Sequence, residues 1–314
     1  MLARVANSLY WTGRYIERSE YLARYLNVQY FSTFDAPMSQ QKEVVLRSIL
    51  GVSNGESPLL ELPEDTLNEQ DVLIEVAFNL TNNNSIFSCV NAARENARNI
   101  RYVVSTELWE AINRYYHFTK NYNIDYYKTR GLYDFTMQAR QHCAIIRSYV
   151  SSTLLHDDIW AFIRLGTHIE RAAQVIRILN SKLSDIDALC SDEKNAPLEV
   201  YQWIVTLKIF ECFDMYKGLH RSDVRQDKVL GFLLSNTNLL RSAAYNLNAL
   251  NTFLSRLSFD LSEDSVLQFQ SGKLENRFRF LEYDEIKDDP AAFLNEALEK
   301  IYDLHDLIQK EYFD

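Results

Sequence analysis

Apolar residues recur three and four positions apart along most of the chain, which is the spacing of one face of an α-helix. The clearest such seam consists of Ile86, Val90, Ala93, Ala97, Ile100 and Val104. Strand-like alternation of Val, Ile and Thr is almost absent, and only 8 Gly and 5 Pro interrupt the 314 residues. The pattern therefore predicts an all-α protein.

Capping and helix-breaking residues set the expected boundaries, with Asp157 and Asp158 as caps of one helix. Helices are expected at residues 2–31, 40–50, 65–80, 86–104, 131–155, 158–183, 198–218, 223–234 and 289–312. A further helix is expected to begin at residue 107. Polar, Gly-rich or Pro-rich segments at 51–63 and 184–197 predict surface loops. The acidic region 258–289 follows no clear pattern.

Residues 13–18 and 166–171 share the pattern Gly-x-x-Ile-Glu-Arg, each inside an expected helix. A stripe at i, i+4 and i+11 is common to both copies, reading Gly13, Glu17, Arg24 and Gly166, Glu170, Arg177. Glycine lets another backbone approach, although a helix interior disfavours it by roughly 1 kcal/mol relative to Ala. We therefore expect these two helices to cross at Gly13 and Gly166.

A second motif repeats at nearly the same distance along the chain as the first. Phe78, Asn82 and Ser88 correspond to Phe232, Asn236 and Ser242. Two motifs at one offset indicate a tandem duplication. We expect a single domain over residues 1–314, built from repeats at about 1–155 and 156–314. The repeats should share one core about a pseudo-twofold axis.

Charge and composition exclude several classes of protein. A net charge of −10 argues against a general nucleic-acid binder, which needs a basic surface. No 18-residue uncharged apolar run occurs, so no membrane span is expected. The four cysteines, Cys89, Cys143, Cys190 and Cys212, form no closely spaced pair, which favours free thiols in a reducing cytoplasm.

Over essentially its full length the chain resembles the bacterial alpha-E family, a helical family named for a Glu-Arg motif. The resemblance lies in residues 2–26, 85–101, 107–113 and 160–172. It implies a role in ATP-dependent amide ligation or peptide modification, with a circularly permuted ATP-grasp-type protein as partner and possibly a transglutaminase-like protein. It assigns no catalytic residue. Residues 81–84 depart from the Asp- and Pro-containing turn of relatives, which puts any role of that turn's carboxylate in doubt.

Glu17 and Glu170 are the candidates for catalytic carboxylates, because two carboxylates in a dry core shift each other's pKa. The alternative, which we favour, is that both are buried ion pairs, Glu17 with Arg177 and Glu170 with Arg24. No Glu-x-x-His occurs, so a ferritin-like metal site lacks its motif and no metal is expected. No cofactor is evident in the chain.

Arg94, Arg98 and Arg101, called here the arginine rail, lie along one helix face and are candidates for binding an anionic substrate group. The aligned residues of the second repeat are uncharged, which favours function over an ordinary solvated face. Arg18 and Arg171 project away from the glycine stripe and need separate partners, in a packed layer or in solvent. The isolated His142, His156 and His168 are expected to be structural.

Three functional hypotheses follow. The leading one is a partner or substrate-positioning component of an ATP-dependent amide-ligating system. The second is an enzyme with Glu17, Glu170 and the arginine rail in one cleft, and the third is a structural scaffold. A pocket with convergent Glu and Arg groups would favour the enzyme, whereas a filled interface would favour the partner.

Overall fold

The structure is a computed structural model that describes residues 1–36, 42–53, 57–63, 66–189, 196–221, 223–257 and 266–314. Within these ranges the regular elements are all helical, so the all-α prediction is confirmed. No described helix is long and apolar enough to cross a lipid bilayer.

Two helices of more than thirty residues, α1 (Ala3–Asp35) and α8 (Asp158–Leu189), form the centre of the molecule. Helices α2, α4 and α7 pack on α1, and α12 and α14 pack on α8. The elements of the first half are α2 (Lys42–Val52), η1 (Pro58–Glu61), α3 (Glu69–Ala77), α4 (Ile86–Asn99), α5 (Thr106–Asn121), α6 (Ile124–Tyr126), η2 (Tyr127–Gly131) and α7 (Leu132–Ser152). Those of the second half are α9 (Ala196–Ile209), α10 (Phe213–His220), α11 (Gln226–Leu234), α12 (Ala243–Leu257), α13 (Val266–Arg279), η4 (Tyr283–Glu285) and α14 (Pro290–Tyr312).

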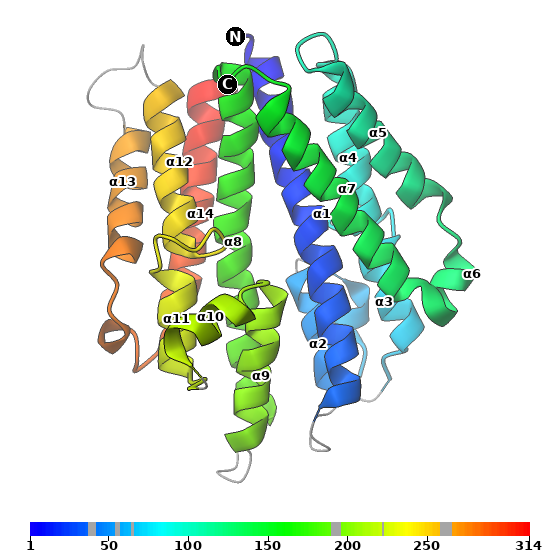
Figure 1. The fold of residues 1–314 in the computed structure, drawn as a ribbon, viewed down its shortest axis with the longest axis vertical. Coiled ribbons are helices and arrows are strands. Elements are labelled where there is room, and N and C mark those ends of the chain that lie inside the picture. The colour runs from blue at the N-terminus through cyan, green and yellow to red at the C-terminus, as the bar shows by residue number, and fades with distance from the viewer. Residues whose placement is uncertain (37–41, 54–56, 64–65, 190–195, 222, 258–265) are drawn as a thin grey trace.

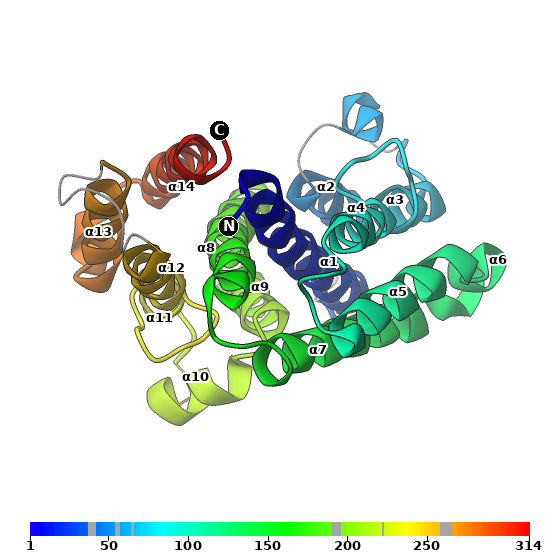
Figure 2. The same ribbon diagram turned by 90° about the horizontal axis from the view of Figure 1, so that it is seen from above.

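The halves of the chain lie on opposite sides of the α1–α8 pair (Figure 1). Seen from above, α2 to α7 flank α1, while α11 to α14 flank α8 (Figure 2). Both chain ends lie at the same end of the molecule. The predicted seam is confirmed over α4, where Ile86, Val90, Ala93 and Ala97 are buried in one continuous core. The expected helix ends at Asn99 rather than at 104, so Ile100 and Val104 lie beyond it.

Several expected boundaries were wrong, and the region left unassigned contains a helix. The expected loop at 184–197 is helical up to Leu189 and again from Ala196, where α9 begins. Polar residues there looked like a loop, but they have buried partners: the Lys182 ammonium donates to Gln29 Oε1 at 2.7 Å and to Asp185 Oδ2 at 2.8 Å. The unassigned region 258–289 contains α13, and its residues 258–265 lie outside the described residues.

The expected helix 198–218 is two helices, α9 and α10, separated by a turn at Glu211. Glu211 has φ of 52°, in the left-handed region that terminates helices and that residues other than glycine rarely adopt. The carbonyl of Ile209 consequently accepts a hydrogen bond from Arg24 of α1 rather than one from within its own helix. The turn thus places a carboxylate beside the central pair of helices.

Candidate functional site

Helices α1 and α8 cross with their backbones in contact at the two glycines. A Cβ on Gly13 would lie 2.2 Å from the carbonyl oxygen of Ile163, and a Cβ on Gly166 would lie 2.0 Å from that of Tyr10. Any side chain would therefore overlap the neighbouring helix. The predicted crossing at Gly13 and Gly166 is confirmed.

The Glu-Arg motifs exchange partners across this crossing. Arg171 donates to both carboxylate oxygens of Glu17, with Nε–Oε1 and Nη2–Oε2 distances of 2.8 and 2.7 Å. In the same way Arg18 donates to Glu170, with Nε–Oε1 and Nη2–Oε2 distances of 2.7 and 3.0 Å. Both glutamates are buried, so the motif joins the central helices through two forked, charge-assisted pairs.

This pairing corrects the expectation that Glu17 would pair with Arg177 and Glu170 with Arg24. The two helices run in the same direction, so residues at equal distances from Gly13 and Gly166 face each other. Arg24 lies 11 residues beyond Gly13, which is about 16 Å along the helix axis. Arg24 instead contacts Glu20 at 3.2 Å, and Arg177 donates to the Tyr302 hydroxyl, approaching Glu170 only to 3.8 Å. The long guanidinium side chains of Arg18 and Arg171 reach around to the facing helix, which a projection of Cα positions does not reveal.

Glu170 is enclosed by further donors. Arg14 Nε donates to its Oε2 at 2.9 Å, and Gln174 Nε2 donates to its Oε1 at 2.9 Å. Arg18 also donates to Asn84 Oδ1 at 2.5 Å, so the Asn-rich turn at 81–84 supplies an amide oxygen to this site. The sequence pattern gave no sign of this, because Asn84 looks like an ordinary turn residue. Both carboxylate oxygens of Glu170 therefore accept hydrogen bonds from at least two side chains.

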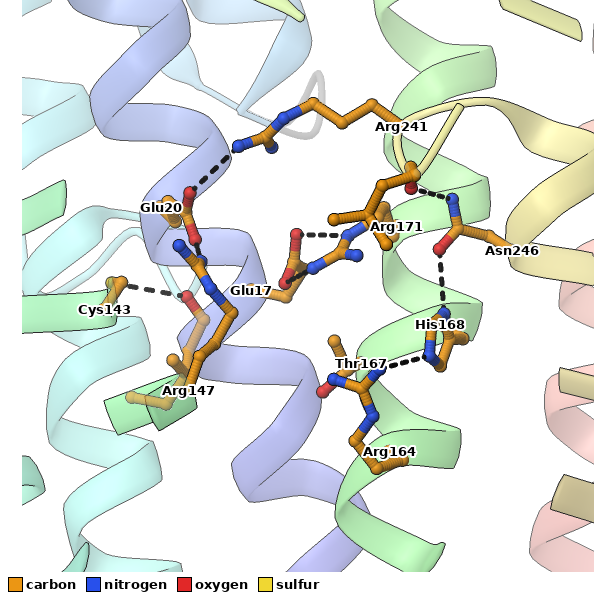
Figure 3. Close-up of polar contacts among 12 residues, drawn as sticks. Glu17, Glu20, Cys143, Arg147, Arg164, Thr167, His168, Arg171, Arg241 and Asn246 are labelled. Carbon is orange, nitrogen blue, oxygen red and sulfur yellow. Dashed lines mark hydrogen bonds and ion pairs between the residues drawn. The ribbon is translucent and has the colours of Figure 1, made fainter. Parts of the chain in front are cut away.

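Beyond Glu17 lies an arginine cluster, defined here as Arg24, Arg140, Arg147 and Arg241 around Glu20 and Glu211. Arg147 and Arg241 both pair with Glu20, which is buried at 2 % exposure (Figure 3). Arg140, Arg24 and Arg241 pair with Glu211. Three segments distant in sequence, α1, α7 and the turn before α12, thus deliver four arginines to two carboxylates.

Arg164 continues this positive region toward α12. Its Nη2 lies 3.0 Å from His168 Nε2, and His168 Nδ1 lies 2.8 Å from Asn246 Oδ1 (Figure 3). The Asn246 amide nitrogen donates to the carbonyls of Leu240 and Ser242, which fixes its oxygen toward the imidazole. His168 is therefore protonated on Nδ1 and accepts on Nε2. Burial and the neighbouring Arg164 lower the pKa of His168 to about 3, so the imidazole is neutral.

The pKa values of the ionisable groups described next lie far from neutral pH. Despite burial, Arg171 lowers the pKa of Glu17 to about 2, and Arg18 and Arg14 hold the pKa of Glu170 well below its ordinary range. Burial raises the pKa of Cys143, which contacts the Ile16 carbonyl, to about 12. A permanently ionised, paired carboxylate is a poor general base and a buried neutral thiol is a poor nucleophile.

The arginine rail lies elsewhere, beside α5: Arg94 and Arg98 are on α4, and Arg101 lies in the turn after it. Arg94 donates to Asn113 Oδ1 at 2.9 Å and to Glu95 Oε1 at 2.6 Å, and its guanidinium lies over the Tyr116 ring at 4.5 Å. Arg98 is exposed and pairs with Glu95 at 3.3 Å, while Arg101 lies over the Trp109 ring. Anion binding by the arginine rail stays a prediction. The side chains that the rail contacts differ from those that contact Glu17 and Glu170.

The remaining candidates have structural surroundings. Cys89, Cys143 and Cys212 are free and buried, whereas Cys190 lies outside the described residues. His142 stacks on Tyr115, and His156 stacks on Trp160. Asp157 caps α8 as expected, accepting from the backbone of Ile159. Among the described residues, no group of three or more His, Cys, Asp or Glu is placed to hold a metal ion.

Comparison with protein families gives a match over residues 1–313 to Alpha-E, described as a predicted alpha-helical domain with a conserved ER motif. The chain belongs to the Alpha-E family. The paired Glu17-Arg18 and Glu170-Arg171 are two occurrences of the Glu-Arg sequence for which the family is named. Neither the curated proteins nor the solved structures contain a match to this chain.

Proposed function

We propose that this Alpha-E protein is a substrate-positioning partner of an ATP-grasp-type protein in an ATP-dependent amide-ligation system. Two properties of the Glu-Arg motifs support positioning rather than catalysis. Their carboxylates are buried and forked to arginines, and their pKa values lie far below neutrality. A carboxylate that cannot exchange a proton near pH 7 holds helices together instead of moving protons.

The observation that carries the proposal is an excess of arginine beside the Glu17 motif. Five arginines pair with three glutamates there: Arg24, Arg140, Arg147, Arg171 and Arg241 with Glu17, Glu20 and Glu211. Arg164, whose hydrogen-bond partner is His168, adds a sixth arginine. Amide ligation joins a carboxylate to an amine, so one of its substrates carries a negative group. Partly buried guanidinium forks are well suited to hold such groups in a defined orientation.

Reconstitution tests the proposal. The chain and an ATP-grasp-type protein encoded beside it are mixed with ATP, an amine and candidate carboxylic acids, and products are measured by mass spectrometry. We expect product only with both proteins, and at least tenfold less with Arg241→Gln. The matched control is Arg279→Gln, which removes one exposed arginine at the end of α13. Product from the chain alone would make it the enzyme, and product from the partner alone would refute the proposal.

The rival hypothesis of an enzyme with Glu17, Glu170 and the arginine rail in one cleft receives less support. Glu170 is 0 % exposed and surrounded by Arg14, Arg18 and Gln174. The rail is engaged with side chains of α5.

We also propose that the chain arose by duplication into two repeats around a pseudo-twofold axis, which the reciprocal pairs Glu17–Arg171 and Glu170–Arg18 support.

A further inference from the structure

The Glu170 side of the crossing carries more positive charge than its one carboxylate balances. Arg14, Arg18 and Arg177 approach Glu170 at 2.9, 2.7 and 3.8 Å. Among the described residues, no other carboxylate lies within ion-pairing distance of these three arginines. Taking a charge out of water is costly unless a partner compensates it. Three guanidinium groups around one carboxylate therefore leave positive charge that a further anion would balance.

Of the three arginines, Arg177 is the one whose donors are least used by Glu170. Its Nε and Nη2 both donate to the neutral hydroxyl of Tyr302, at 3.1 and 2.9 Å. Its Nη1 comes no closer to Glu170 than 3.8 Å, which is beyond hydrogen-bond distance. A guanidinium carries five N–H donors, so Arg177 retains donors for another acceptor. It also lines a cavity through which a ligand can reach it.

This cavity has a volume of about 520 Å³ and is lined by residues of α2, α8 and α14. A volume of this size lies within the range of roughly 300–1,000 Å³ that small-ligand sites occupy. Helices α2 and α14 lie on the side of the central pair opposite α7 (Figure 2). The cavity is therefore separate from the arginine cluster, to which α7 contributes Arg140 and Arg147.

Two turns of α8 beyond Arg177, the lining of the cavity consists of hydroxyl and carboxylate groups. Ser48 Oγ lies 3.0 Å from Ser181 Oγ and donates to Asp185 Oδ2 at 2.9 Å. The buried Lys182 ammonium donates to the same Oδ2 at 2.8 Å and balances its charge. Among the described residues, no donor contacts the second oxygen, Oδ1. This end of the cavity therefore suits an N–H donor of a ligand.

The separation of the two ends sets the length of that ligand. Arg177 and Asp185 are eight residues apart in α8, which is about 12 Å along the helix axis. An extended peptide advances about 3.3–3.6 Å per residue, so about four residues cover this separation. The amine and carboxylate of a single amino acid are too close together to reach both ends. Between the ends, Val44, Val52 and Leu298 provide an apolar wall for small side chains.

We propose that the cavity between α2, α8 and α14 binds a short peptide of about four residues, with its C-terminal carboxylate at Arg177 and its N-terminal amine at Asp185. The carboxylate balances part of the positive charge around Glu170. Ser48 acts as a positioning residue that holds Asp185 Oδ2. Binding requires neither ATP nor a partner protein, so the proposal stands or falls separately from the ligation system.

Calorimetric titration of the isolated full chain with tetraalanine, its C-terminal amide and its N-acetyl form tests the proposal. We expect tetraalanine to bind and amidation to weaken binding at least tenfold, because Arg177 loses its anion. Acetylation should also weaken binding, because Asp185 loses the ammonium. Arg177→Gln should bind tetraalanine at least tenfold more weakly and no longer distinguish it from the amide. Arg279→Gln, the same change at an exposed site on α13, should behave like wild type.

A second variant keeps the test valid if Arg177→Gln does not fold, as judged by circular dichroism. Gly51 of α2 lines the cavity, and a Cβ there would meet nothing within 4 Å. Gly51→Leu therefore adds a side chain at the cavity without a clash, and it should abolish peptide binding while retaining helical content. Gly272→Leu in α13, where the Cβ position is equally open, is the matched control and should bind like wild type.

Four results would overturn the proposal. Wild type that does not bind tetraalanine would exclude the site. Equal binding of tetraalanine and its amide would exclude the contact with Arg177, and equal binding of the free and acetylated peptides would exclude the contact with Asp185. Gly51→Leu that binds like wild type would place the peptide outside this cavity.

Discussion

The two Glu-Arg motifs share a sequence but differ in what surrounds them. Glu170 has Arg14, Arg18 and Gln174 as donors, and the Arg14 guanidinium is covered by the Trp11 ring at 4.6 Å. Glu17 has a single forked arginine, Arg171, and lines a cavity with Arg147 and Arg164. One motif is enclosed by further donors, whereas the other borders a cavity large enough for about one water.

This difference shows that the same motif joins the two central helices in both places, while its surroundings differ. Both motifs join α1 to α8 with the same geometry. What distinguishes the Glu17 side is the set of arginines delivered by α7 and the segment before α12. The following predictions test this comparison, from the largest expected effect to the smallest.

Alanine at either crossing glycine should be the most damaging single change. Gly166→Ala and Gly13→Ala each place a Cβ within 2.2 Å of a carbonyl oxygen on the facing helix, so the helices must separate. We expect losses of about 3 kcal/mol or more in the free energy of unfolding, measured with urea. Gly231→Ala in α11 is the control, because nothing lies within 4 Å of its Cβ position, and it should be neutral or stabilise by up to ~1 kcal/mol. Equal stabilities for all three variants would disprove the tight crossing.

Replacing each glutamate with glutamine should lower the free energy of unfolding by different amounts at the two motifs. Removing one partner of a buried pair costs about 3–5 kcal/mol, and we expect Glu170→Gln at the upper end because it strands both Arg14 and Arg18. Glu17→Gln should lie at the lower end, since this change strands a single forked arginine and Glu17 borders a small cavity. Urea unfolding of both variants measures the two losses, and equal losses would remove the distinction between the motifs.

Acid should destabilise the protein in two overlapping windows. The folded state lowers the pKa of His168 from 6.5 to about 3, so the unfolded chain gains the proton first and stability falls as pH drops below 6.5. Arg171 lowers the pKa of Glu17 from 4.5 to about 2, so the stability from this pair is present above pH 4.5 and is lost between pH 4.5 and 2. Urea unfolding across pH 7 to 3 checks this, and Glu17→Gln should flatten only the lower window. A Glu17→Gln curve parallel to wild type below pH 4.5 would contradict the assignment.

The arginine rail should give the smallest effects. Arg98→Ala removes an exposed pair and should change stability by less than about 0.5 kcal/mol, while Arg94→Ala loses a hydrogen bond to Asn113 and should cost about 1 kcal/mol. The rail's proposed anion binding is checked by calorimetry of the Arg94→Ala, Arg98→Ala double variant with ATP, pyrophosphate and acidic peptides. Heats equal to wild type would leave the rail as a salt-bridged face.

The sequence by itself determined the fold class, most helices and the crossing at Gly13 and Gly166. These features depend on local periodicity and on the absence of a side chain, and both are visible in the order of residues. Helix ends were less predictable. The turn at Glu211 requires a non-glycine residue in the left-handed region, where Arg24 of a distant helix binds the freed carbonyl of Ile209.

Only the tertiary structure decided the ion-pair partners and the candidate site. Arginine side chains are long enough to reach either of several helices, so their sequence positions do not select Glu17 for Arg171 or Glu170 for Arg18. Arg147, Arg164 and Arg241 belong to different segments and carry no shared motif. Their convergence depends on where α7, α8 and the segment before α12 meet, because buried charges obtain their partners through space rather than along the chain.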